Sequence, residues 1–140
     1  MDKSAENGVF VAPSNFPSKK IIFSGTGKFQ NDWDDVRSFA HAAKSGVEKA
    51  LETGSVAPLL FFNATQFPQA EIVTLLGALE ALYVPIEVRE QVPKKSVKLI
   101  KLGIFGDDSS KVDLAKALDV GRIISRDIGG SDPERMAAPR

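Results

Sequence analysis

The sequence has no cysteine, and it has one histidine, one tryptophan and one tyrosine among 140 residues. The absence of cysteine excludes disulfides, cysteine-ligated zinc and thiol catalysis, and it suits a cytoplasmic protein. An excess of charge of either sign is also missing, because Lys plus Arg equals Asp plus Glu at 18 each. No net field therefore attracts a polyanion, and we expect neither a nucleic-acid nor a membrane partner.

Long hydrophobic runs are missing too. The strongest apolar run, 59–62, is far shorter than the roughly 20 residues that span a bilayer. The start of the chain, 1–8, lacks the apolar centre of a signal peptide. Apolar residues make up 43% and charged residues 26%, which is ordinary for a soluble globular domain of this size. We therefore expect a soluble, cytoplasmic domain with a real core.

Strand-like and helix-like segments alternate along the chain. Short apolar runs bounded by glycine or proline predict buried strands, and apolar residues spaced by three and four predict helices. Alternation of this kind favours a mainly parallel or mixed sheet with helices on both faces. The sequence therefore predicts an α/β fold. The expected elements are a short strand at 9–11, strands at 20–23, 56–62 and 97–105, an edge strand at 86–89, a helix over 36–51 with Asp32 as N-cap and Gly54 as stop, a helix between Pro68 and Pro85, and a final helix from 109.

The final helix has an apolar stripe at helical spacing, which predicts that this face packs on a core. The stripe consists of Leu114, Ala117, Leu118, Gly121, Ile124 and Ile128. Gly129-Gly130 should end the helix, and Asp132 before Pro133 predicts the opening of another turn or helix. Because a domain rarely stops just after opening its next element, we interpret the chain as the N-terminal part of a longer protein.

A glycine-containing loop, Ser24–Phe29, lies between a predicted strand and a predicted helix, where phosphate-binding loops occur. The P-loop spacing fails because Ile22 replaces its first glycine and Phe29 replaces its Ser or Thr. The dinucleotide fingerprint fails at Gln30, where its third glycine belongs. A plain turn is the favoured interpretation, and the candidate ligand-binding residues of the loop are Gly25, Gly27 and Lys28.

Other polar groups have ordinary structural interpretations. His41 lies inside a helix with no partner nucleophile in a recognisable arrangement. The pairs Asp34-Asp35 and Asp107-Asp108 precede helices, where capping explains acidic residues. We therefore predict no catalytic residue, no metal ligand and no cofactor in this chain. Trp33 and Tyr83 are expected at helix ends, and the lysines at 94, 95, 98 and 101 on a solvated edge.

Three stretches together resemble the N-terminal domain of the leucine (cytosol) aminopeptidases. They are Ile21–Lys28 with the following helix and strand, Leu76–Tyr83, and Ser125–Met136. The last stretch is the most distinctive, because Arg126-Asp127 and the turn after it resemble the family's junction with its catalytic domain. Ser125 and the turn at 130–133 depart from the family's usual residues.

The resemblance implies a three-layer α/β/α, macro-like domain over 20–128, after a poorly patterned segment at 1–19 and before a linker at 129–140. It implies a parent enzyme that removes N-terminal amino acids from peptides with two divalent metals, zinc or manganese, in a separate catalytic domain. The expected partners are that domain and further copies, usually in a hexamer. The expected role here is non-catalytic, in oligomer assembly and active-site access. A standalone domain that binds a nucleotide or an ADP-ribose-type ligand is the alternative.

Overall fold

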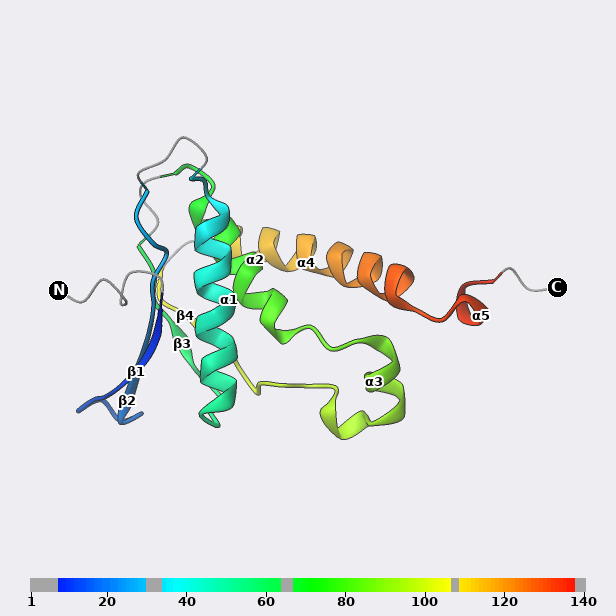
Figure 1. Ribbon diagram of the computed structural model, residues 1–140, viewed down its shortest axis with the longest axis horizontal. Coiled ribbons are helices and arrows are strands. Elements are labelled where there is room, and N and C mark those ends of the chain that lie inside the picture. The colour runs from blue at the N-terminus through cyan, green and yellow to red at the C-terminus, as the bar shows by residue number, and fades with distance from the viewer. Residues whose placement is uncertain (1–7, 30–33, 64–66, 107–108, 138–140) are drawn as a thin grey trace.

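The computed structural model describes residues 8–29, 34–63, 67–106 and 109–137. Helices dominate it, and its strands are short and gather on one side of α1 (Figure 1). The fold is therefore mixed α/β, as the sequence predicts in outline. In chain order the elements are β1 (Val9–Pro13), β2 (Lys20–Ser24), α1 (Arg37–Glu52), β3 (Leu59–Leu60), α2 (Ala70–Leu82), α3 (Ile86–Gln91), the 3₁₀ turn η2 (Pro93–Lys95), β4 (Gly103–Ile104), α4 (Ser109–Gly130) and α5 (Pro133–Met136).

β1 and β2 form an antiparallel hairpin, whose register pairs Val9 with Ser24 and Pro13 with Lys20. The inner face of β2 is fixed to α1 by two polar contacts. Ser24 Oγ donates to the carbonyl of Ala42 at 2.7 Å, and Lys20 Nζ donates to the carbonyl of Thr53 at 2.7 Å. The hairpin is thus attached to the first half of α1 and to its C-terminal end, and β1 contains the short strand predicted at 9–11.

β3 and β4 pair in parallel, but over two residues each, with Leu59 opposite Gly103 and Leu60 opposite Ile104. The predicted strands at 56–62 and 97–105 were therefore too long. Pro58 has no N–H to donate, which limits the ladder on that side. The segment before β4 is joined to the neighbouring chain through isolated bonds, such as that from Ile100 N to the carbonyl of Val56 at 3.0 Å.

The predicted edge strand at 86–89 was wrong, because these residues form the start of α3. Pro85 precedes the helix with an extended backbone, and its carbonyl accepts from Arg89 N at 3.0 Å. Four alternating residues are too few to separate a period of 2 from a period of 3.6. A proline immediately before a segment is compatible with a helix start, and here that signal was the informative one.

The core lies where α1 crosses α2, and it is built mainly from small side chains. Ala43, Val47, Ala78 and Ala81 are buried together with Leu99. At the crossing, a Cβ added to Gly77 would stand 2.3 Å from the carbonyl oxygen of Ala40. Only glycine permits the two backbones to approach this closely. The packing of α1 against α2 therefore depends on small residues at the crossing rather than on large interlocking side chains.

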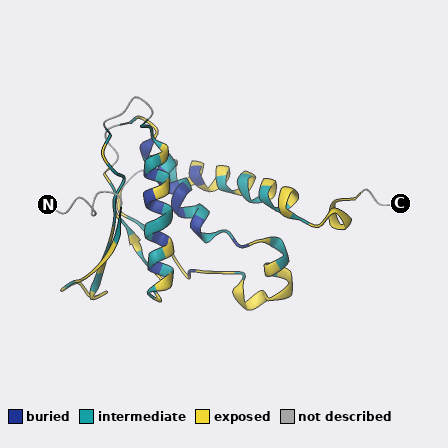
Figure 2. Ribbon diagram, in the orientation of Figure 1, coloured by how far each residue is buried: buried dark blue, intermediate teal, exposed yellow. Residues whose placement is uncertain are grey.

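α4 does not pack as its sequence predicts. Leu114, Leu118, Ile124 and Ile128 of its apolar stripe are 53%, 45%, 53% and 57% exposed, and Ala115 is its one buried residue among those described. Figure 2 shows burial concentrated on α1 and α2, with α4 mostly half-buried or exposed. The helix ends at Gly130, which confirms the predicted stop, and α5 follows with Asp132 as its N-cap. No helix in the described part of the chain combines the length and the apolarity needed to cross a membrane.

The outer face of the strands is also uncovered within the described residues. Ile21 and Phe23 of β2 point away from α1 and are 46% and 56% exposed. Leu59, Phe61 and Phe105 are likewise exposed around the parallel pair, and the rings of Phe61 and Phe105 lie 5.4 Å apart. Two apolar surfaces, one on the strands and one on α4, are therefore open in this structure.

Replacing Gly77 by alanine should lower the free energy of unfolding by about 3 kcal/mol, because the new methyl group can be placed only if two helix backbones separate. Gly129→Ala is the matched control. Gly129 is also helical, and a Cβ there would meet nothing within 4 Å. The control should be neutral or stabilising by up to about 1 kcal/mol. Urea unfolding followed by circular dichroism checks both, and equal effects would contradict the close crossing.

Candidate functional site

The glycine-containing loop after β2 lies beside α1. With residues of α1 it borders a hollow of about 220 Å³, lined by Val9, Ser24, Gly25, Thr26, Ser38, His41, Ala42 and Ser45. Gly25 donates its N–H to the carbonyl of Gly8 at 3.1 Å, and Gly27 turns the chain with a φ of 82°. Of the candidates Gly25, Gly27 and Lys28, the first lines this hollow and the other two do not. His41 does line it, from the exposed side of α1.

Asp35, the second residue of the acidic pair before α1, has a structural role at the helix start, as the sequence predicts. Asp35 Oδ1 accepts from Arg37 N at 2.8 Å, and the carboxylate also pairs with the Arg37 guanidinium at 2.7 Å. The hydrogen bond from the Arg37 backbone lowers the pKa of Asp35. Asp35 is therefore a helix-start carboxylate. The N-cap prediction for Asp32, the predicted role of Gln30 and the predictions for Trp33 and Asp107-Asp108 fall outside the described residues.

The lysines predicted on a solvated edge, at 94, 95, 98 and 101, are all exposed. Lys94 and Lys95 are exposed in η2, while Lys98 Nζ donates to the carbonyl of Ala81 at 2.8 Å. Lys98 thus binds the C-terminal turn of α2, where a cation is favoured by the helix dipole. Lys101 is exposed between η2 and β4.

A cluster that sequence analysis missed lies where α2, α3 and α4 meet, and we call it the junction cluster. Its centre is Asp127 of α4, which accepts from Tyr83 Oη at 2.9 Å and pairs with the Arg89 guanidinium. These bonds lower the pKa of Asp127, with the Arg89 hydrogen bond as the main cause. Burial, and then the bond to Asp127, raises the pKa of Tyr83. Three separate helical segments are thereby joined through one carboxylate.

A second carboxylate, Glu80 of α2, completes the junction cluster. It accepts from Lys44 at 3.0 Å and from Arg122 at 2.5 Å, and it pairs with Arg126 at 3.2 Å. Arg126 also lies over the ring of Tyr83, 5.3 Å from its centroid. The cations hold the pKa of Glu80 below its ordinary value, chiefly through the Lys44 hydrogen bond. α4 is therefore fixed to α2 by its charged face.

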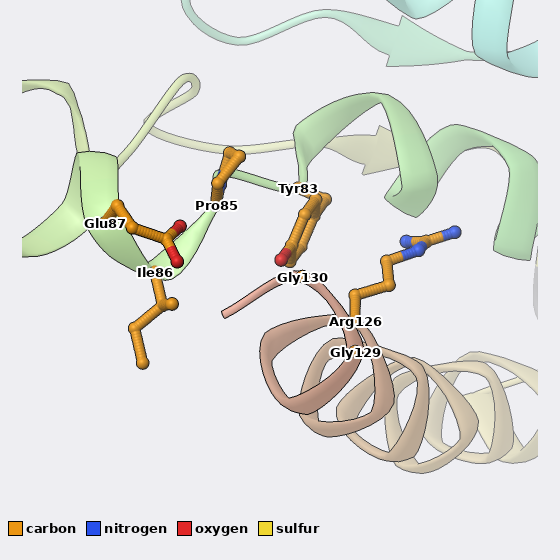
Figure 3. A pocket seen from close by; sticks show the side chains of 7 residues that line it. All are labelled: Tyr83, Pro85, Ile86, Glu87, Arg126, Gly129 and Gly130. Atoms are coloured by element: carbon orange, nitrogen blue, oxygen red, sulfur yellow. The ribbon is translucent and has the colours of Figure 1, made fainter. Parts of the chain in front are cut away.

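A shallow cleft of about 390 Å³ opens beside the junction cluster. Figure 3 shows Tyr83 reaching from the end of α2 toward α4, with Arg126 rising from α4 next to it. The other lining residues are Pro85, Ile86, Glu87, Gly129 and Gly130. This lining is mainly apolar, and it contains no paired nucleophile and base in hydrogen-bond contact.

The chemistry available here is that of a structural clamp. No group of three or more His, Asp or Glu side chains that could hold a metal ion occurs among the described residues. The segment after α4 is also joined to α3, because Arg135 of α5 pairs with Glu90 of α3 at 2.6 Å. The signal that could have found the cluster was present in the sequence, since Arg126-Asp127 and the aromatic end of α2 were both in the resembling stretches. Their pairing across about 40 residues could not be inferred from either stretch alone.

The folded-state pKa of Asp127 is lowered, so its carboxylate stabilises the fold at pH values above its ordinary pKa of about 4. That contribution should disappear as the pH falls below 4 toward the lowered value. Asp127→Asn should therefore be less stable than the parent at pH 7, with a smaller difference between the two at pH 3. Tyr83→Phe should cost about 1 kcal/mol at pH 7 through the lost hydrogen bond. Urea titrations at both pH values measure this, and an Asp127→Asn deficit that is equal at pH 7 and pH 3 would contradict it.

Comparison with known proteins gives one informative match. No family model matches the sequence, and no solved structure matches it. The chain is 41% identical over 136 residues to a Caenorhabditis elegans protein named "Putative aminopeptidase". That alignment covers 94% of this chain, and the chain spans 26% of the length of the worm protein. The chain is thus related in sequence to about a quarter of a protein that is named as an aminopeptidase.

Proposed function

We propose that this chain is the non-catalytic N-terminal domain of a leucine-aminopeptidase-like metallo-exopeptidase, a cytoplasmic enzyme that removes N-terminal amino acids from peptides. The observation that carries the proposal is the 41% identity to one quarter of a protein named as an aminopeptidase. It agrees with the resemblance of Leu76–Tyr83 and Ser125–Met136 to the leucine aminopeptidases. Under this proposal, two divalent metals, zinc or manganese, belong to a catalytic region outside these 140 residues.

The character of the junction cluster supports this division of labour. Its carboxylates are engaged by arginine and lysine side chains, as Asp127 is by Arg89 and Glu80 by Arg122, rather than held open for a metal. A carboxylate already neutralised by a guanidinium is a poor ligand for a divalent ion. The cluster instead fixes the direction in which the chain leaves α4. We propose that it sets the placement of this domain against the catalytic region, and through it oligomer assembly and access to the active site.

The proposal also includes the finer fold, a three-layer macro-like domain over 20–128 with a linker at 129–140. The uncovered apolar face around Phe23, Phe61 and Phe105 supports it, because a sheet with helices on one side leaves the other side to be covered.

The 140-residue chain with added zinc or manganese should give no turnover of leucyl p-nitroanilide above the rate of metal and buffer alone. A commercial leucine aminopeptidase under the same conditions is the positive control. Measured turnover that is abolished by Asp127→Asn or Glu80→Gln would contradict the proposal, because it would place the chemistry in this chain. Turnover that those variants leave unchanged would indicate a contaminating peptidase. Further purification of the chain should then remove the activity.

A second candidate function is supported by the hollow between the loop after β2 and α1. The hydroxyl groups of Ser38 and Ser45 could bind a nucleotide or an ADP-ribose-type ligand there, while those of Ser24 and Thr26 already donate to the carbonyls of Ala42 and Gly27. If this candidate holds, ADP-ribose at millimolar concentration should raise the melting temperature, and Ser45→Leu should abolish the shift by filling the hollow. Ser55→Leu, outside the hollow, is the matched control. No shift in the parent chain would reject this function.

A further inference from the structure

The cleft of about 390 Å³ beside the junction cluster has room for a ligand of its own. It is bordered by the residues that end α2, those that begin α3 and the last turns of α4 (Figure 3). Its volume lies at the lower end of the range for small-molecule sites, so it can hold one small ligand. Three features of the lining favour a ligand that carries positive charge.

The first feature is the carboxylate of Glu87. Within the described part of the chain Glu87 makes no hydrogen bond and no ion pair, although the residue is partly buried. Figure 3 shows its side chain extending toward Tyr83 across the cleft. The pKa of Tyr83 is raised by burial, then by the hydrogen bond to Asp127, and to a smaller degree by the charge of Glu87. The carboxylate is therefore close to the ring and lacks a cation of its own.

The arginines around the cleft are already engaged by other carboxylates. Arg89 pairs with Asp127, Arg126 with Glu80, and Arg135 with Glu90. The Nη1 atom of Arg126 has no partner among the described residues, but it is enclosed and so does not reach a ligand in the cleft. Glu87 is thus left to receive a cation from outside the chain.

The second feature is the ring of Tyr83. Arg126 lies over one face of the ring, 5.3 Å from its centroid, and the other face borders the cleft (Figure 3). The hydrogen bond from Tyr83 Oη to Asp127, at 2.9 Å, holds the ring in place. Because the face of an aromatic ring carries partial negative charge, it attracts ammonium groups.

The third feature is the C-terminal end of α4. This helix of 22 residues ends at Gly129 and Gly130, which line the cleft with backbone because they have no side chains. The last turn of a helix carries partial negative charge on carbonyl groups that lack helical partners. α4 has no basic residue in its last turn to offset that charge. The helix end therefore favours a cation at the same place as Glu87 and Tyr83.

We propose that this cleft binds the ammonium group of an organic amine with a small apolar body, supplied by the amino terminus of a peptide or by a lysine side chain. Glu87 pairs with the ammonium group, the ring of Tyr83 contacts it, and Pro85 and Ile86 contact the apolar part of the ligand. A divalent metal is a poor fit, because it needs several oxygen ligands and the cleft offers one carboxylate. This site does not depend on the proposed function, since amine binding is measured without turnover.

Leucinamide is the first probe, at about pH 6.5, where an α-amino group with a pKa of about 8 is charged. Titration into the 140-residue chain, followed by amide chemical shifts in NMR spectra, should give saturable shifts at Ile86, Glu87, Gly129 and Gly130. A ligand this small in a shallow cleft should bind with a dissociation constant on the order of a millimolar. The neutral analogue 4-methylpentanamide lacks only the amino group and should bind about fivefold more weakly or worse.

Glu87→Gln should weaken leucinamide binding about fivefold, because it removes the charge and keeps the shape of the side chain. Glu48→Gln is the matched control, since Glu48 is exposed on α1, has no ion pair within the described residues and does not line the cleft. It should leave the affinity unchanged. Tyr83→Phe keeps the ring and should bind leucinamide within about twofold of the parent chain. The unliganded spectrum of each variant reports whether it is folded.

A comparison of leucinamide with Nα-acetyl-lysinamide distinguishes the two sources of the amine. Tighter binding of leucinamide would indicate a peptide amino terminus, and tighter binding of Nα-acetyl-lysinamide would indicate a lysine side chain. Four results would overturn the proposal: no saturable shift with either amine, equal affinity for 4-methylpentanamide, unchanged affinity in Glu87→Gln, or tighter binding of the anion N-acetyl-leucine. None of these results involves peptidase activity, so failure here is distinct from failure of the proposed function.

Discussion

The close approach of α1 and α2 at Gly77 and Ala40 is the constraint on which the rest of the structure depends. Two helices that meet backbone to backbone need small side chains along both faces, and Ala43, Ala78 and Ala81 supply them. The approach brings Lys44 of α1 next to Glu80 of α2, within 3.0 Å. Glu80 is then positioned to accept from Arg122 and Arg126, which direct α4. A distance set by the lack of one Cβ thus determines where the last helix lies.

The junction cluster carries this constraint toward the C-terminal end of the chain. Asp127 joins the end of α2 through Tyr83 and the last turn of α3 through Arg89, and Arg135 joins α5 to α3 through Glu90. Charge-assisted hydrogen bonds of this kind are directional, so they fix orientation as well as proximity. The charged side of α4 is consumed in this way. Its apolar side is exposed within the described part of the chain, which reverses the usual arrangement of an amphipathic helix.

Several elements were predictable because their signals are local. The helix of α1 follows from periodicity, and the end of α4 at Gly130 and the start of α5 at Asp132 follow from their stop and capping residues. The strands at 56–62 and 97–105 were overestimated, because an apolar run records burial and not hydrogen-bond pairing. The segment at 86–89 was wrongly predicted as a strand, because four alternating residues are too few to distinguish a strand from a helix. The clamp around Asp127 could not be predicted, because Tyr83, Arg89 and Asp127 are polar residues far apart in sequence.

By itself the sequence determined the α/β class, the positions of the main helices, the lack of thiol chemistry and a resemblance carried by the stretch around Arg126-Asp127. These properties depend on composition and on spacings of a few residues. Only the tertiary structure decided which face of each helix is buried. On α4 the sequence favours burial of the leucine and isoleucine stripe, yet the ion pairs of Arg122 with Glu80 and of Asp127 with Arg89 turn the opposite face inward. An amphipathic pattern predicts that one face of a helix makes apolar contacts, but the pattern does not identify the residues that this face contacts.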